Sequence, residues 1–205
     1  MTSGLLCLAL GVTECAAWVV HATAVLRFGG GPYPMPFNSA LTLAVTGAAL
    51  ALHAARRWLW ATILVAAVFD TVLGLLSLAE DVFGHSLGID QLLVRAYISG
   101  PGGHPGRMPG STAACYVLIG LGLLAWAPWR SRPRPVVIAA TGALTSAIAI
   151  AAAFRYEDSA LHAYDWGRLS SMAVPTAAAL IVLGISLPCA AWRGASYERL
   201  SLIHI

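Results

Sequence analysis

Long apolar segments alternate with short polar ones along the whole chain. Six of these segments can cross a hydrocarbon core of about 30 Å, because a helix needs about 20 residues to do so. They cover residues 4–26, 38–55, 58–79, 112–128, 135–154 and 172–192. Glycine and alanine are frequent within them, as expected where helix backbones pack closely inside a membrane. The pattern therefore predicts an all-α integral membrane bundle of six transmembrane helices.

The distribution of arginine predicts how this bundle is oriented, because basic residues are retained on the cytoplasmic side. The segments after the second, fourth and sixth runs hold seven Arg and one acid, Glu198. The other three connections hold five Arg against six acids. We therefore predict a multi-pass protein of the bacterial inner membrane with both termini in the cytoplasm. Cleavage of the first run as a signal peptide after Ala24 is the alternative, but no basic residue precedes that run and it contains Glu14 and His21.

Composition supports a membrane protein and excludes several other classes. Hydrophobic residues make up 59% of the chain and charged residues 10%, against about 45–50% and about 25% in soluble domains. A net charge of +3 is too small and too scattered to suggest nucleic acid binding. The four cysteines lie in apolar runs without a C-x-x-C pair, which favours buried hydrophobic side chains over a disulfide or zinc site.

The second, fourth and sixth runs begin with a similar motif, which we call the start motif. It begins at Met35, Met108 and Met172, has a hydroxyl residue four positions later and glycine twelve positions later. The residues involved are Asn38, Ser39 and Gly47 in the first copy, Thr112 and Gly120 in the second, and Thr176 and Gly184 in the third. We interpret the motif as a helix start, with proline in the first turn and Asn38, Ser111 or Ser171 as the capping residue; direct ligand contact is the alternative. The repetition predicts three parallel two-helix repeats.

Three polar residues within the predicted spans are candidates for an intramembrane sensing site. Glu14 and His21 lie two turns apart in the first run, and Asp70 lies in the middle of the third. Ionisable residues inside a membrane are costly and are often functional. The two readings are proton or ligand sensing by these residues and interhelical hydrogen bonding that fixes their packing.

Histidine and acidic residues also gather in the predicted outer connections. Imidazole and carboxylate groups together can bind a transition metal or respond to pH. The candidates are His85, Asp90, His104, Arg107, Asp165 and Arg168. No two histidines stand at metal-ligand spacing, so we expect no metal, and solvated loop residues are the alternative reading. Residues 83–97 are expected to lie flat on the outer interface as an amphipathic segment.

No enzymatic centre or cofactor is expected. The sequence contains no His-Glu-x-x-His or Walker-type string. Its one Gly-x-Ser-x-Gly string, residues 84–88, lies in a predicted outer connection and not between a strand and a helix, as that motif requires. His21 and His53 would lie near opposite sides of the membrane, so one haem iron cannot take both as axial ligands.

Two outer-loop strings carry a resemblance to a known family. Gly88-Ile-Asp-Gln-Leu-Leu93 followed by His104-Pro-Gly-Arg-Met108 resembles the middle of a polytopic module at the N-terminus of bacterial membrane-bound sensor histidine kinases. Related modules precede PAS and diguanylate cyclase domains. Ala163-Tyr-Asp-Trp-Gly-Arg168 and Met172-Ala-Val-Pro-Thr-Ala177 resemble its last outer loop and sixth helix. The likeness extends from about Met35 to Arg193, but Asp165 and Pro175 stand where the family tends to have Gly and His.

The resemblance implies a sensory input module that acts on a cytoplasmic transmitter in cis, as a possible homodimer, with no assigned ligand. Residues 1–195 would form this module, and residues 196–205 the start of a cytoplasmic linker helix that we interpret as truncated. Pro188 is a plausible bend in the sixth helix. A small polytopic transporter or channel-like protein is the alternative, because repeats and mid-span acids also suit a substrate path.

Overall fold

The computed structural model describes residues 2–27, 33–56, 59–98, 105–126, 135–154 and 172–203. Within these residues the fold is all-α, with seven α-helices, one 3₁₀ helix and no strand. The helices are α1 (Thr2–Val19), α2 (Thr23–Leu26), α3 (Phe37–Ala55), α4 (Trp60–Phe83), α5 (Gly110–Trp126), α6 (Pro135–Phe154) and α7 (Val174–Ile203). The 3₁₀ helix η1 (Ile89–Gln91) lies between α4 and α5.

Each of the six predicted apolar runs contains a helix, and four of them are long and apolar enough to cross a membrane. These four are α1, α3, α4 and α6; α5 and the apolar part of α7, Val174–Cys189, are shorter. The apolar helices indicate a membrane protein, as predicted from the sequence. The first run is interrupted, because α1 ends at Val19 and His21 adopts a positive φ of 58° before α2 begins.

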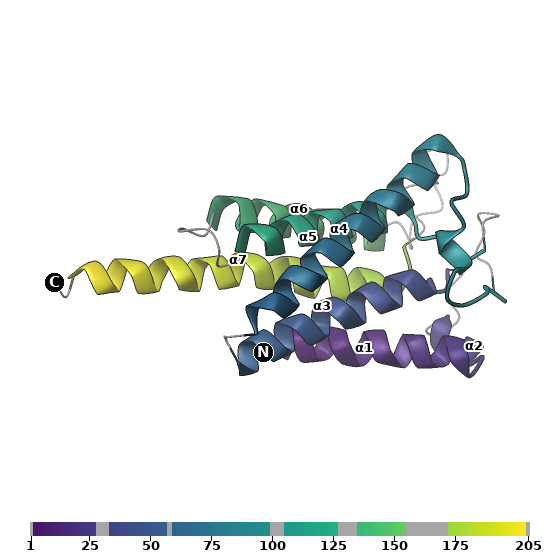
Figure 1. Ribbon diagram of the computed structural model, residues 1–205, viewed down its shortest axis with the longest axis horizontal. Coiled ribbons are helices and arrows are strands. Elements are labelled where there is room, and N and C mark those ends of the chain that lie inside the picture. The colour runs from purple at the N-terminus through teal and green to yellow at the C-terminus, as the bar shows by residue number, and fades with distance from the viewer. Residues whose placement is uncertain are drawn as a thin grey trace.

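The helices pack as three neighbouring pairs, α1 with α3, α4 with α5, and α6 with α7 (Figure 1). The N-terminus of α1 and the C-terminus of α3 lie at one end of the bundle. The opposite end carries α2 and residues 84–98, and we call it the loop end (Figure 1). Helix α7 begins at the loop end and continues past the other helices at the opposite end (Figure 1).

A glycine of the start motif lies at the contact within each pair. A Cβ atom added to Gly47 would stand 2.8 Å from the carbonyl oxygen of Gly4. The equivalent distances are 2.7 Å from Gly120 to Ala67 O and 2.7 Å from Gly184 to Gly142 O. These distances leave no room for a side chain, so the backbones of the two helices approach as closely as small-residue membrane interfaces allow.

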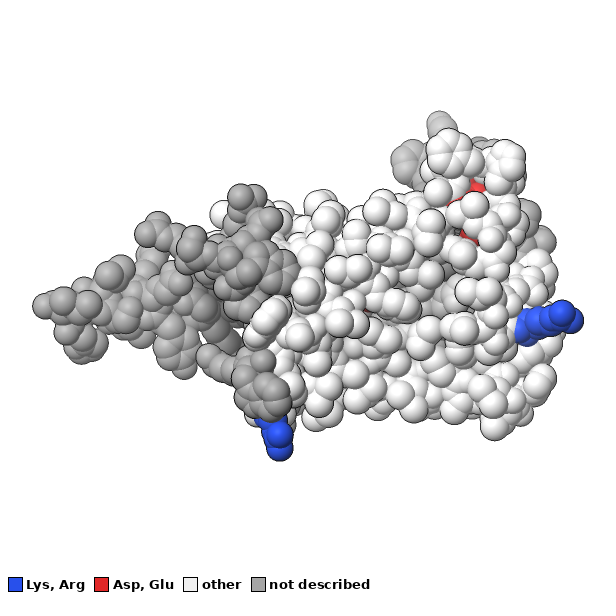
Figure 2. All heavy atoms as spheres, in the orientation of Figure 1, with Lys and Arg blue, Asp and Glu red and all other residues white. Residues whose placement is uncertain are grey.

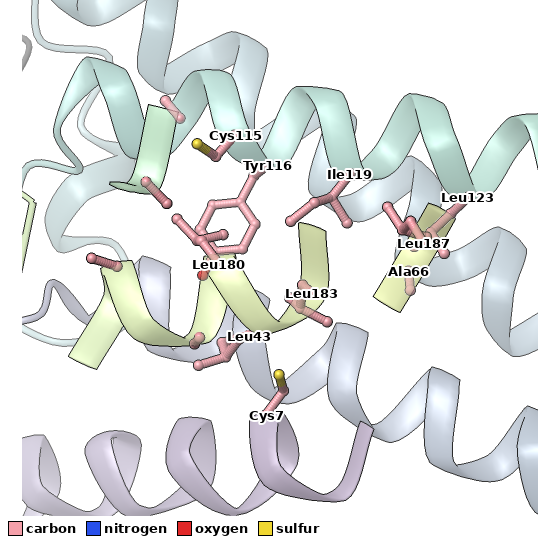
Figure 3. Close-up of a cluster of buried hydrophobic side chains, with 14 of the residues drawn as sticks. Cys7, Leu43, Ala66, Cys115, Tyr116, Ile119, Leu123, Leu180, Leu183 and Leu187 are labelled. Atoms are coloured by element: carbon pink, nitrogen blue, oxygen red, sulfur yellow. The ribbon is translucent and has the colours of Figure 1, made fainter. Parts of the chain in front are cut away.

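The bundle core lies between the helices that carry the start motif. Leu43, Tyr116 and Leu180 each stand eight residues after the motif methionine, and all three are fully buried. The Tyr116 ring points from α5 toward Leu180 (Figure 3). The sequence repeat thus places equivalent positions of α3, α5 and α7 in one hydrophobic cluster.

The outward helix faces are apolar, whereas several acidic and hydroxyl side chains are buried. Exposed hydrophobic residues follow one face of α4, at Val65, Val68, Val72 and Leu75. The face in Figure 2 has charged side chains near the two ends and almost none between them. A surface of this kind is poorly suited to water and well suited to lipid, because apolar area exposed to water is costly.

Candidate functional site

The start-motif methionines are fully buried, but the motif does not cap the helices as we predicted. Helix α3 begins at Phe37 with Pro36 as its N-cap residue and no side-chain cap. Asn38 therefore lies inside the first turn, where its amide donates a 2.9 Å hydrogen bond to Ile89 O of η1. Ser111 likewise lies inside α5 and has no hydrogen-bond partner among the described residues. The capping prediction was wrong for these two residues because α3 and α5 begin two residues earlier than capping by Asn38 and Ser111 would require. Ser171 lies outside the described residues.

The hydroxyl residues four positions after the methionines are buried in all three copies. Ser39, Thr112 and Thr176 have at most 1% of their surface exposed. None of the three side-chain oxygens has a hydrogen-bond partner within the described part of the chain. Direct ligand contact by the motif, the alternative to a helix start, therefore stays a prediction.

The structure does not bring Glu14 and His21 together. Glu14 lies inside α1 and is 1% exposed, with its Oε2 atom unpartnered among the described residues. His21 lies in the turn after α1, is exposed, and stacks on the ring of Tyr97 at a centroid distance of 4.3 Å. The left-handed turn at His21 redirects the chain, so helical spacing from Glu14 no longer applies there.

Asp70 is fully buried at the contact between α3 and α4. The hydroxyl of Thr46 lies 2.7 Å from Asp70 Oδ2, so the two helices are joined by a polar contact inside the bundle. The second carboxyl oxygen, Oδ1, has no hydrogen-bond partner among the described residues. The sequence singled out Asp70 but not Thr46, because a threonine inside an apolar run is common and gives no signal by itself.

At the loop end, residues from α3, α4, η1 and the segment before α5 form one polar cluster. Arg107 Nε donates to Asp90 Oδ2 at 3.2 Å, and both side chains are about 90% buried. The backbone turns between them at Gly106, whose φ is +77° and whose added Cβ would stand 3.0 Å from Asp90 O. A residue with a side chain would be strained there on both counts. With the Asn38 bond to Ile89 O, this contact holds η1 against the starts of α3 and α5.

Glu80 completes this cluster from the last turns of α4. Its Oε1 atom accepts a hydrogen bond from the backbone N–H of Leu87, which ties the segment that leads to η1 to the end of α4. We call Glu80, Asp90, Arg107 and Asn38 the loop-end cluster. Sequence reasoning placed Glu80 among many outer acids and did not single it out. The turn at Gly84 that brings the Leu87 N–H to it is a tertiary feature that no sequence pattern marks. A cavity of about 110 Å³ adjoins the cluster and is lined by Ser86, Gly88, Asp90, Gln91, Pro105 and Arg107.

Residues 83–97 were expected to form a flat amphipathic segment, but most of this stretch is irregular. Only η1 is helical after α4 ends, and Leu92 and Leu93 are exposed. Tyr97 packs edge-on against Trp18 at 5.0 Å, and its hydroxyl donates to Ala17 O at 3.3 Å. Burial raises the pKa of Tyr97, so the phenol keeps the proton that it donates. The segment thus covers part of the loop end without forming a continuous helix.

The other outer-loop candidates do not join the cluster in the described structure. His85 is exposed and its Nδ1 lies 2.7 Å from Phe83 O. His104, Asp165 and Arg168 lie outside the described residues. Within the residues that the structure describes, no three His, Cys, Asp or Glu side chains are grouped so that they could hold a metal ion.

Comparison with known proteins adds no family to these observations. No family model matches the chain, and neither does any curated protein or solved structure.

Proposed function

We propose that this chain is the membrane-embedded sensory input module of a bacterial signal-transduction protein. In this proposal α1, α3, α4, α5, α6 and α7 all cross the inner membrane and form three parallel two-helix repeats. A periplasmic or intramembrane stimulus changes how the pairs pack, and α7 passes this change to a cytoplasmic transmitter in cis. The likeness of residues 88–93, 104–108 and 163–177 to the histidine-kinase module suggests the role.

Three structural features support the six-span arrangement. The paired helices run between the same two ends of the bundle, and their outward faces are apolar. The start-motif glycines lie at the closest contact of each pair. Helix α5 has 17 residues and a length of about 25 Å, which is short for a span, but it packs along the 24-residue α4.

The observation that carries the signalling role is the continuity of α7. Met172 and Thr176 are buried at the loop end, Leu180 and Leu187 are buried in the core, and the same helix runs on to Ile203. It remains helical through Pro188, which would permit a bend there. A single helix of 30 residues is stiff enough to transmit a rotation or shift from the bundle to a domain attached beyond it.

A stimulus can act on this arrangement only if it binds two packing states unequally. The loop-end cluster joins the start of α3, the end of α4 and the segment that leads into α5, so a change there alters contacts in two helix pairs at once. Dimerisation through the attached transmitter is part of the proposal.

A helix-phase experiment tests this proposal. Residues 1–199 are fused to the transmitter of a histidine kinase, and kinase output is measured in membranes after insertion of four or seven residues behind Arg199. Four residues rotate the transmitter by about 40° and seven by about −20° relative to the parent helix, with different axial shifts. We expect the four-residue insertion to change output strongly and the seven-residue insertion to keep it near the parent. Equal output from all three fusions would contradict the role of α7.

A small transporter or channel is the second candidate, favoured by the buried carboxyl groups of Glu14 and Asp70. Proton or solute flux into vesicles that contain only this chain would support it. If this flux is lost in Glu14→Gln or Asp70→Asn, and the kinase fusions do not respond to helix phase, transport replaces sensing as the proposed function.

A further inference from the structure

The outward apolar face of α4 continues to the last residue of the helix. Val72 and Leu75 lie on this face, and Val82 and Phe83 extend it, because residues seven and eight positions beyond Leu75 return to the same side of a helix. Val82 is 75% exposed and Phe83 72%. The 24 residues of α4 span about 36 Å, which exceeds a hydrocarbon core of about 30 Å. The end of α4 also projects beyond α5 and α6 (Figure 1), so this face is long enough to reach the lipid headgroups.

The segment that follows α4 adds three exposed leucines to this end. Leu92 is 76% exposed, Leu93 62% and Leu87 55%. The segment is held in place at two points. Glu80 of α4 accepts the backbone N–H of Leu87, and Asn38 of α3 donates to the backbone of η1, which directly precedes Leu92. We call the exposed residues of this end, Val82, Phe83, Leu87, Leu92 and Leu93, the loop-end apolar surface.

The charged side chains around this surface are sorted by sign. Glu80 is 1% exposed and Asp90 7%, so these two acids contribute almost nothing to the surface. Arg95, which closely follows the leucines in the chain, is exposed, as is Arg27 at the end of α2. Asp81 is half-buried. Among the described residues, the loop end therefore presents apolar side chains together with two exposed arginines.

Two observations favour lipid as the partner of this surface. Apolar side chains that face water are costly, and here they continue the face of α4 that is already suited to lipid. Arginine beside exposed leucines is complementary to a membrane interface, because its N–H groups bind phosphate oxygens while apolar neighbours enter the acyl boundary. A second copy of the chain would bring the same arginines against each other, which like-charge repulsion disfavours.

We propose that the loop-end apolar surface binds the outer leaflet of the inner membrane, with its leucines at the acyl boundary and Arg95 on the phosphates of anionic phospholipids. Through this surface the module senses the lipid composition of that leaflet, a step that rests on the topology and function proposed above.

The hydrogen bonds that hold the segment connect the lipid contact to the bundle. Leu87 is bonded to Glu80 of α4, and η1 is bonded to Asn38 of α3. Asp90 of η1 is paired with Arg107 in the segment that leads into α5. A shift of the leucines toward or away from the bilayer therefore changes contacts in two helix pairs at once.

Photocrosslinking of the full chain in lipid vesicles tests the surface. An amino acid with a diazirine side chain replaces Leu92, and mass spectrometry counts the adducts in phosphatidylcholine vesicles with or without about 30% phosphatidylglycerol, an anionic lipid. We expect a lipid-adduct yield close to that at Val72, on the outward face of α4. Gln91 is the matched position, because its amide donates to Pro105 O and lies in the polar cavity, and its yield should be several-fold lower.

The role of Arg95 is tested in the same vesicles. We expect phosphatidylglycerol to be enriched about threefold in the adducts at position 92, relative to its share of the lipid. Arg95→Gln should remove this enrichment and keep the total yield, since the leucines still hold the segment at the membrane. Arg56→Gln is the control, because it removes an exposed arginine at the opposite end of the bundle, and the enrichment should persist.

Two results at position 92 would overturn the proposed surface: crosslinks to a second copy of the chain in place of lipid, or a lipid yield no higher than at Gln91. Position 93 repeats the test if the first variant does not fold. Enrichment that survives Arg95→Gln would overturn the role of this arginine.

The sensing step is measured as kinase output of the fusion of residues 1–199 in the same two kinds of vesicle. Output should differ between them, and Arg95→Gln should abolish the difference. If lipid adducts form but the fusions ignore helix phase, the surface stands and the sensory role falls. Phase-sensitive fusions without lipid adducts give the converse, and phase-sensitive fusions with equal output in both vesicles overturn lipid sensing alone.

Discussion

The hydroxyl oxygen of Thr46 lies 2.7 Å from Asp70 Oδ2 and 2.9 Å from the carbonyl oxygen of Thr42. A threonine hydroxyl has one proton and cannot donate to both acceptors. Either it bonds an Asp70 carboxylate, or it bonds Thr42 O and accepts a hydrogen bond from a neutral Asp70. In both arrangements α3 and α4 are joined by a buried polar contact.

This contact predicts non-additive effects of substitution. Thr46→Val leaves the fully buried Asp70 carboxyl without its partner and should lower the free energy of unfolding by about 1–2 kcal/mol. The double variant Thr46→Val/Asp70→Leu removes both polar groups and should be less destabilised than Thr46→Val alone. Thermal unfolding in detergent measures all variants, with Asp70→Asn expected to remain near the wild type because an amide can both donate and accept. Strictly additive losses would contradict the contact.

The close contact between α6 and α7 predicts that Gly142 tolerates no larger residue. A Cβ atom there would stand 2.5 Å from Gly184 O and 2.6 Å from Pro188 Cδ. Gly142→Val must separate the two helices and should cost about 1–3 kcal/mol of stability. Ala143→Val adds methyl groups on the exposed side of the same helix and should leave the melting temperature nearly unchanged. Similar melting temperatures for the two variants would show that the backbones are not in contact.

The buried ion pair at the loop end predicts a difference between two arginines of the same segment. Arg107→Met leaves the Asp90 carboxylate buried without its cation, whereas Arg95→Met removes an exposed charge. We expect Arg107→Met to increase protease cleavage between residues 84 and 98 by about tenfold or more, consistent with the cost of an unpaired buried charge. Arg95→Met should be cleaved as slowly as the wild type. Equal cleavage of both variants would count against the loop-end cluster.

Trp18 forms a further contact between α1 and the segment that precedes α3, and this contact predicts a loss of stability on substitution. Its indole N–H donates a 2.8 Å hydrogen bond to the carbonyl oxygen of the fully buried Met35. Trp18→Phe keeps much of the aromatic packing but loses the donor, and should cost about 1–2 kcal/mol in thermal unfolding. Val19→Phe on the exposed neighbouring position is the control and should have little effect. A Trp18→Phe protein as stable as the wild type would exclude a contribution from this bond.

The sequence by itself determined the helices of this protein, because the length of an apolar run and the position of polar connections are local properties. It also marked Gly47, Gly120 and Gly184 as equivalent, since a repeated spacing is visible without a structure. Only the tertiary structure decided which polar groups meet. The left-handed turn at His21 separates it from Glu14, the fold-back after Gly84 brings the Leu87 N–H to Glu80, and the packing of α3 on α4 brings Thr46 to Asp70. These contacts depend on turn geometry and helix packing between residues up to tens of positions apart, and helical periodicity carries no information about either.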